Sequence, residues 1–229
     1  MLQRLALPVL LSAALLAASP VVAGRWGGGG SRPGIEIEDR IDLIQVDRRI
    51  LAIDSRSQRQ LEFTLDVNEQ LLGLDSRGAV AVVRTNQRLL GLTSEHGSFQ
   101  QLRYRVGERQ AVPDDVYLGD RVLAVPLENR LVALSTTTES FQILEMGPRE
   151  QIQRALADNN VVGIVTQRRA IAFSVRFPSF VEVTLSPKET IENTSVNDSS
   201  ITLVTSRRIL IYRAGTGVWN DLNRKNRVR

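Results

Sequence analysis

The sequence predicts an all-β protein built from five similar units. One observation is a repeated word in which an arginine precedes a short apolar run, as in TQRRAIAFS from Thr166 to Ser174. A second is the spacing of its copies, which lie 39, 42, 39 and 39 residues apart. A period of about 40 residues is typical of arrays of four-stranded antiparallel units. We number each copy from its arginine, and these reference residues are Arg49, Arg88, Arg130, Arg169 and Arg208.

The residues around each arginine predict a hairpin. Five positions earlier stands an aliphatic residue in every copy, and the two positions just before the arginine are always polar. After the arginine come the apolar runs ILAI, LLGL, LVAL, AIAF and ILIY. These runs do not alternate with polar residues, so we expect this second strand of the hairpin to be covered on both faces.

Two further columns place the remaining strands. The third position of the second strand is small in four copies, which predicts that neighbouring sheets approach closely there. These residues are Ala52, Gly91, Ala133 and Ala172, and the fifth copy has Ile211. Eleven positions after the arginine stand the residues that open a third strand, Phe99, Phe141, Phe180 and Trp219, with Leu61 one place late in the first copy. A fourth strand, such as TIENTSV from Thr190, completes the unit.

The ends of the repeat array predict a closed ring. The fifth copy stops after its third strand, near Leu222, and the short segment Ile35–Glu38 precedes the first hairpin. We expect this segment to supply the missing strand, because closure leaves no open sheet edge. The predicted fold over 35–223 is therefore a five-bladed β-propeller of four-stranded antiparallel blades, closed by an N-terminal strand. A trefoil would need three such repeats, and the coils of a β-helix are shorter.

The stretch from Ile35 to Leu222 resembles the β-propeller superfamily. The last copy, ILIYRAGTGVWNDL, looks like a kelch-type strand, loop and tryptophan strand. The glycine doublets of kelch repeats and the Gly-His and Trp-Asp dipeptides of WD repeats do not occur. The resemblance thus implies an architecture and assigns a role to no residue.

The N-terminus predicts export. Residues 1–23 have a basic start at Arg4, an apolar run from Leu5 to Ala18 and a small-residue cleavage site before Gly24, as in a signal peptide. Pro20 interrupts the run, which is also shorter than the 20 or so residues of a membrane anchor. We expect a periplasmic or secreted protein without stable membrane insertion, with a Gly-rich linker at 24–34 and a basic tail at 224–229.

Composition narrows the classes of partner and cofactor. The chain has no cysteine, which excludes disulfides and thiolate metal sites. Its formal charge of +4 becomes −1 once Arg4 and the four basic residues of the tail are set aside. A nearly neutral body argues against nucleic-acid binding. The Asp- and Asn-rich loops could hold Ca²⁺, but these are also ordinary turn residues, so we expect no metal and no cofactor.

The arginine of each repeat is the candidate binding residue. We expect the set to ring one mouth of the propeller channel, close to glutamates that follow 20 residues later, at Glu69, Glu108, Glu150 and Glu189. One interpretation is pairing, of Arg88, Arg130 and Arg169 with Glu108, Glu150 and Glu189. The alternative is that Arg49, Arg88, Arg130, Arg169 and Arg208 form an anion site for an acidic partner.

The predicted function is an exported, non-catalytic binding or scaffold module for a protein or a cell-envelope polymer, acting as a monomer. No nucleophile elbow, phosphate loop or histidine pair occurs, and the single His96 is expected in an exposed turn. Two alternatives stay open. A lectin would need aromatic platforms, although only 5% of residues are aromatic. A glycoside hydrolase or lyase would need paired carboxylates in the central cavity.

Overall fold

A computed structural model describes residues 40–108 and 116–223, all of which belong to one compact unit, Ile37–Arg229. The predicted signal peptide, the linker, the closing strand Ile35–Glu38 and the basic tail lie outside the described residues. The described part is built of β-strands and turns, and it contains no helix that could cross a membrane.

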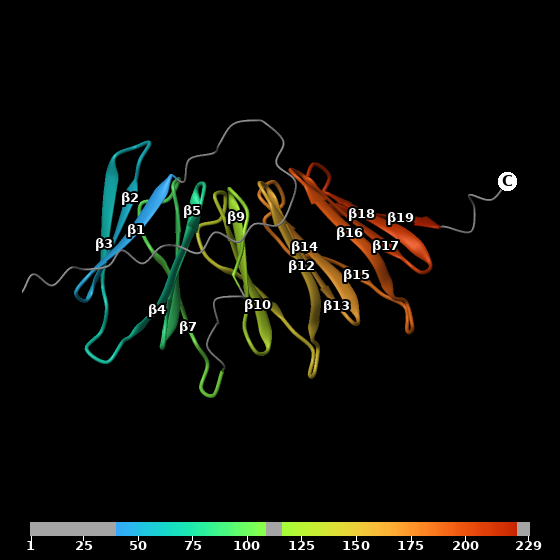
Figure 1. Ribbon diagram of the computed structural model, residues 1–229, viewed down its shortest axis with the longest axis horizontal. Coiled ribbons are helices and arrows are strands. Elements are labelled where there is room, and N and C mark those ends of the chain that lie inside the picture. Colours follow the sequence, from blue (N-terminus) through green and yellow to red (C-terminus); the bar gives the residue numbers. More distant parts are fainter. Residues whose placement is uncertain (1–39, 109–115, 224–229) are drawn as a thin grey trace, which may run out of the picture. The chain divides into compact units, whose positions relative to one another are not determined.

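Five antiparallel sheets follow one another along the chain, and we call them blades 1 to 5 (Figure 1). Blade 1 holds β1 (Ile41–Val46), β2 (Arg49–Asp54) and β3 (Arg59–Thr64). Blade 2 holds β4 (Leu71–Arg77), β5 (Val80–Thr85), β6 (Arg88–Thr93) and β7 (Gln100–Arg103). Blade 3 holds β8 (Tyr117–Leu118), β9 (Val122–Pro126), β10 (Arg130–Ser135) and β11 (Gln142–Glu145).

The last two blades repeat this plan. Blade 4 holds β12 (Ile152–Asp158), β13 (Val161–Thr166), β14 (Arg169–Ser174) and β15 (Val181–Thr184). Blade 5 holds β16 (Ile191–Asn197), β17 (Ser200–Thr205), β18 (Arg208–Arg213) and β19 (Val218–Asn223). In every blade the strands pair in chain order, so each blade is a simple meander.

The grouping of strands into blades differs from the prediction by one strand. The strand expected to complete one repeat instead begins the next blade: β16 pairs with β17 and not with β15. The reason is the length of the connections, because two residues join β16 to β17, as in a tight hairpin, whereas six separate β15 from β16. Blade 5 therefore has all four strands, and the expectation that it lacks one was wrong. The three-stranded sheet is blade 1, within the residues that the structure describes.

The hydrophobic core lies between blades. Every residue of β5, β6, β10 and β13 is buried, and so is every residue of β14 except Arg169, which confirms the predicted cover on both faces for the hairpins of blades 2 to 4. In blades 1 and 5 the corresponding strands β2 and β18 are only partly buried, so the prediction was wrong for the two end blades. Residues of successive blades form each cluster, such as Ala124 and Ala133 of blade 3 with Ile164 and Phe173 of blade 4. Continuous apolar runs are thus explained by packing on two neighbours.

The small and aromatic columns meet at these junctions. A Cβ atom on Gly91 of blade 2 would lie 2.6 Å from the ring of Phe141 in blade 3 and 2.7 Å from Leu134. The same small–aromatic combination occurs in the clusters at the other junctions, as Ala52 with Phe99, Ala133 with Phe180 and Ala172 with Trp219. The expected close approach of the sheets is confirmed, and its purpose is to make room for the ring of the following blade.

A ladder of backbone hydrogen bonds also links the blades at the turns that lead into their buried hairpins. Arg40 N donates to Gly78 O at 2.8 Å, and Ala79 N donates to Asp120 O at 2.6 Å. The ladder continues through Arg121 N to Asn159 O and Asn160 N to Asp198 O, at 2.9 and 3.1 Å. These bonds hold the turns of all five blades side by side.

Ring closure is not observed. No strand of blade 1 pairs with a strand of blade 5 in the described part of the chain, and the two stand at opposite ends of the row in Figure 1. Within residues 40–108 and 116–223, blades 1 and 5 are therefore end blades, each packed on one neighbouring blade. The predicted closing segment lies outside these residues.

Candidate functional site

The five reference arginines occupy the same place in every blade. They open β2, β6, β10, β14 and β18, which is the middle strand of the three in blade 1 and the third of four in chain order in blades 2 to 5. In blades 2 to 5 the arginine thus opens the third strand in chain order, whereas the sequence predicts the second. The side chains of Arg88 and Arg130 are 7% and 4% exposed, whereas that of Arg49 is 51% exposed.

Arg88 shows the arrangement in full. Its Nε lies 2.8 Å from Glu69 Oε1, and its Nη2 lies 2.5 Å from Glu69 Oε2. Glu69 belongs to the connection between blades 1 and 2. Its carboxylate also accepts hydrogen bonds from Thr85 Oγ1 at 2.8 Å and from Asp66 N at 3.0 Å. A two-pronged, charge-assisted pair of this kind is strong and geometrically specific, so it ties the connecting loop to the blade that follows.

We call the pair of Arg88 and Glu69 a clasp, and an equivalent pair of arginine and glutamate recurs at each later junction. The shortest distances between guanidinium and carboxylate are 2.6 Å for Arg130 with Glu108, 2.8 Å for Arg169 with Glu150 and 2.9 Å for Arg208 with Glu189. Each arginine of blades 2 to 5 thus pairs with the glutamate of the preceding repeat, whereas Arg49 of blade 1 lies near Glu62 of its own blade. The predicted pairing of Arg88, Arg130 and Arg169 with the glutamate that follows was wrong. The loop that carries each glutamate leads into the next blade, so its carboxylate faces that blade's arginine.

The clasps stabilise the ionised glutamates. Burial raises the pKa of Glu69, but hydrogen bonds from Arg88, the Asp66 amide and Thr85 outweigh burial and bring the pKa to about 2. Glu189 has a pKa of about 2 for the same reasons, with Arg208 as its main partner. The pKa values of Glu108 and Glu150 are lowered as well. Four of the five arginines are therefore already neutralised within the protein, and anion binding by the set stays a prediction.

The best candidate for a binding site is a groove on the turns that carry the backbone ladder. We call it the turn groove, and its volume is about 500 Å³. Turn residues at equivalent positions in all five blades line it, together with one residue from a loop of blade 1 and one from a loop of blade 2. The lining residues are Arg40, Arg56, Gly78, Ala79, Glu95, Asp120, Arg121, Asn159, Asn160 and Asp198.

Asp120 gives the turn groove a polar floor. Its Oδ1 accepts a hydrogen bond from Arg77 Nε at 2.9 Å, whereas its Oδ2 is buried and has no hydrogen-bond partner among the described residues. Burial raises the pKa of Asp120 against the effect of Arg77, and the nearby Asp158 and Asp198 raise it further. A buried acceptor without a partner is costly, so a hydrogen-bond donor from a ligand or a water molecule would be favoured here.

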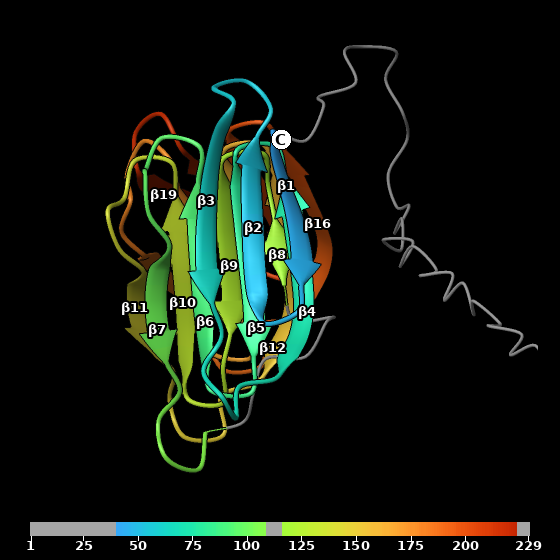
Figure 2. The same ribbon diagram turned by 90° about the vertical axis from the view of Figure 1, so that its left-hand side faces the viewer.

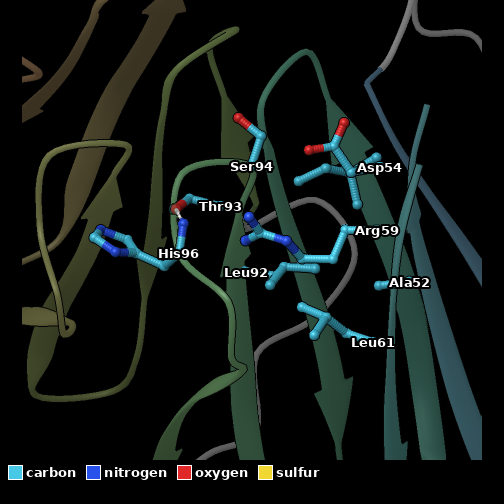
Figure 3. Close-up of a pocket in the computed structure, with 9 residues that line it drawn as sticks. Ala52, Asp54, Arg59, Leu61, Leu92, Thr93, Ser94 and His96 are labelled. Carbon is cyan, nitrogen blue, oxygen red and sulfur yellow. Dashed lines mark hydrogen bonds between the residues drawn. The ribbon is translucent and has the colours of Figure 1, made fainter. Parts of the chain in front are cut away.

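A second cavity lies between blades 1 and 2 and is too small for a substrate. Its volume of about 10 Å³ is near that needed by one water molecule. Figure 3 shows apolar side chains such as Leu61 and Leu92 beside Asp54 and Arg59, with the imidazole of His96 turned away from them. This histidine follows β6 in a turn, as predicted, although it is half-buried rather than exposed.

Metal ligands are not assembled in the described ranges, where no three His, Asp or Glu side chains form a group suited to a cation. Asp75 lies in β4 and pairs with Arg84 at 2.9 Å, and Asp114 and Asp115 lie outside the described residues. The sequence predicts that the Asp- and Asn-rich loops between blades share one face, but it does not predict that their turns form a groove. Its signal was the recurrence of Asp, Asn or Gly just before each hairpin.

Comparison with known proteins gives a distant structural likeness. No protein-family model and no curated protein sequence matches the chain. Among solved structures, the N-terminal domain of Nup159 is 10% identical, with a TM-score of 0.36, over 82% of this chain and 59% of that one. Apo AztD from Citrobacter koseri is 12% identical, with a TM-score of 0.40, over 80% and 59%. Hsv2p of Kluyveromyces lactis is 10% identical, with a TM-score of 0.37, over 84% and 63%.

The match thus takes in less than two thirds of each of those chains. The class of protein follows from the topology itself. Five successive antiparallel meanders, packed face to face and linked at equivalent turns, have the blade organisation of β-propeller proteins.

Proposed function

We propose that this chain is an exported, non-catalytic binding module that holds a segment of a partner protein in the turn groove. The observation that carries the proposal is that equivalent turns from all five blades line one groove. A rigid stack of sheets that presents a row of turns is a common way to build a recognition surface, because the scaffold fixes the position of each turn.

The charges of the turn groove favour a polypeptide. Arg40, Arg56 and Arg121 line the turn groove together with the carboxylates of Glu95, Asp120 and Asp198. A polymer with charge of one sign would meet repulsion from half of these groups. A peptide segment carries backbone donors and acceptors and side chains of both signs, so it can match the mixed pattern and supply a donor to Asp120.

Site-specific photo-crosslinking in cells that produce the protein tests the proposal. A photoreactive amino acid at Glu95, which is exposed at the turn groove, is expected to capture a defined partner protein. The same amino acid at Arg207, which is exposed at the clasp end of blade 5, serves as the matched control. The variant Asp198→Lys should reduce capture from Glu95. Equal capture from both positions, or capture that Asp198→Lys leaves unchanged, would contradict binding in the turn groove.

The lectin and the glycoside hydrolase remain alternatives predicted by the sequence. Binding to a glycan array would support the first, and release of reducing ends from polysaccharides would support the second.

A further inference from the structure

The two end blades each present an apolar face that no described strand covers. Each internal junction joins a forward face of one blade, which carries the small column, to a rear face of the next blade, which carries the aromatic column. Blade 1 has an uncovered rear face, and Figure 2 looks directly onto this end of the row. Its apolar residues are Ile44, Val46, Leu51 and Ile53. Blade 5 has an uncovered forward face, with Val204, Ile209, Ile211 and Leu222.

These faces have the composition of internal junctions. Ile44 is 45% exposed, yet the equivalent Val83 of blade 2 is 1% exposed. At the other end Leu222 is 46% exposed, and Ile211 stands where the forward face of blade 4 has the fully buried Ala172. Strands with apolar residues on both faces are normally covered on both. Each end blade therefore has the surface of a blade that has two neighbours.

The two end blades differ from the repeat at one position each, and the sizes of the two side chains are complementary. Four blades have a small residue on the forward face, against which the ring of the next blade packs. Blade 5 has the larger Ile211 at this position. Blade 1 has Gln60 at the position of the ring, and the assignment of Leu61 to that column was wrong, because Leu61 pairs with Ala52 and packs toward blade 2. On the free forward face of blade 5, Ile211 thus replaces a small residue. On the free rear face of blade 1, Gln60 replaces an aromatic ring. The two changes compensate if these faces meet.

Charge is complementary at the same junction. Between blades 4 and 5, Ser174 Oγ lies 3.0 Å from Tyr212 OH. The repeat places Arg213 at the position of Ser174 and Ile53 at that of Tyr212, and Asp42 is the cross-strand neighbour of Ile53. An exposed arginine at one end would therefore face an exposed aspartate at the other.

We infer that a second copy of this chain covers these faces, with the forward face of blade 5 in one copy stacked on the rear face of blade 1 in the next. Among the described residues, no sheet and no hydrophobic cluster joins blade 1 to blade 5, so both faces are uncovered in a single copy. A second copy can cover each face without any rearrangement within either chain. The contact is head-to-tail, and such contacts build rings or open chains of copies. The monomer that the sequence predicts stays a prediction, and the experiment below decides between the two.

Light scattering after gel filtration of the full chain tests the inference. The parent should form species that grow with protein concentration. Ile44→Lys disables the rear face and Leu222→Lys the forward face, and each should weaken association at least about tenfold, equivalent to about 1.4 kcal/mol. Ile143→Lys, a change at a side chain that is 43% exposed in β11, is the matched control and should associate like the parent.

Mixing the two variants gives the decisive result. Each retains one intact face, and the intact faces are complementary, so the mixture should form a 1:1 dimer and nothing larger. A parent that is monomeric at all concentrations would overturn the inference in favour of closure within one chain or a free surface. Dimers that only one of the two variants abolishes would overturn it in favour of a symmetric contact.

A charge exchange checks the register independently. Asp42→Arg and Arg213→Asp should each weaken association, and the double variant should restore it. Failure of the double variant to recover, when both single variants are folded by circular dichroism, would contradict the proposed facing of these residues. Asp42 and Arg213 do not line the turn groove. Failure of self-association in these variants can therefore be distinguished from failure of partner capture at the turn groove.

Discussion

The substitution Glu69→Gln tests whether the clasps hold the blades together. It removes one charge and preserves the size of a side chain that is fully buried. Arg88, which is 7% exposed, then keeps only Asp66 as a charged partner, at 3.2 Å. Breaking one partner of a buried ion pair typically costs about 3 to 5 kcal/mol, because the remaining charge is left without compensation.

The pKa of Glu69 gives a second measure of the same interaction. A decrease from the ordinary value of 4.5 to about 2 corresponds to about 3 kcal/mol of stability at neutral pH. Because the folded-state pKa is depressed, this stability is present above the unfolded pKa and is lost as the pH falls toward 2. About 2 kcal/mol of it should be gone by pH 3. Glu69→Gln has no such carboxyl, so its difference from the parent should shrink over this range.

Urea unfolding followed by circular dichroism at a series of pH values from 7 to about 3 measures both effects. The matched control is Glu62→Gln, which removes the exposed partner of Arg49, 3.6 Å away. An exposed pair contributes about 0 to 1 kcal/mol, so this variant should stay close to the parent. The account of the clasps would be refuted if Glu69→Gln lost no more unfolding free energy than the control. It would also be refuted if the difference in unfolding free energy between Glu69→Gln and the parent did not shrink as the pH falls.

Three further predictions concern packing, the arginines and export. Gly91→Leu should destabilise the protein by about 1 to 3 kcal/mol through clash with Phe141, and Phe141→Ala in the same chain should relieve part of that strain, as thermal unfolding would show. Arg130→Gln should lower the free energy of unfolding in urea by about 3 to 5 kcal/mol, whereas Arg49→Gln should lower it by less than about 1 kcal/mol. If Arg49→Gln keeps its stability but is retained more weakly on a sulfated resin, anion binding is supported. Unchanged retention would count against anion binding. N-terminal sequencing of exported protein should begin at Gly24, and retention of the first residues would disprove cleavage there.

The local features of the fold could be predicted from the sequence because they depend on local patterns. The apolar runs after Arg88 and Arg130 predict strands covered on both faces, and both strands are buried throughout. The small column predicts close approach of the sheets, which Gly91 and Phe141 confirm. In each case, residues at the same position of the repeat have similar surroundings in the fold. Five copies therefore give repeated evidence for the same prediction.

The candidate site could be predicted only in part. The sequence places Arg88 and Glu69 in turns at the same end of the blades, and they do meet. It does not reveal that the glutamate comes from the preceding repeat, because this depends on which blade the connecting loop enters. The two-residue connection at Asp198 and Ser199 was a signal for the correct grouping, since a turn that short joins neighbours in one sheet.

The sequence by itself determined the number of repeats, the strands within them and the residues that pack between sheets. Only the tertiary structure decided the grouping of strands into blades, the partner of each arginine, the groove made from five separate turns and the free faces at the ends. The physical reason is that hydrophobic patterning acts on each strand alone, whereas strand pairing, ion pairing and blade stacking depend on residues about 20 to 40 positions apart that the folded chain brings together.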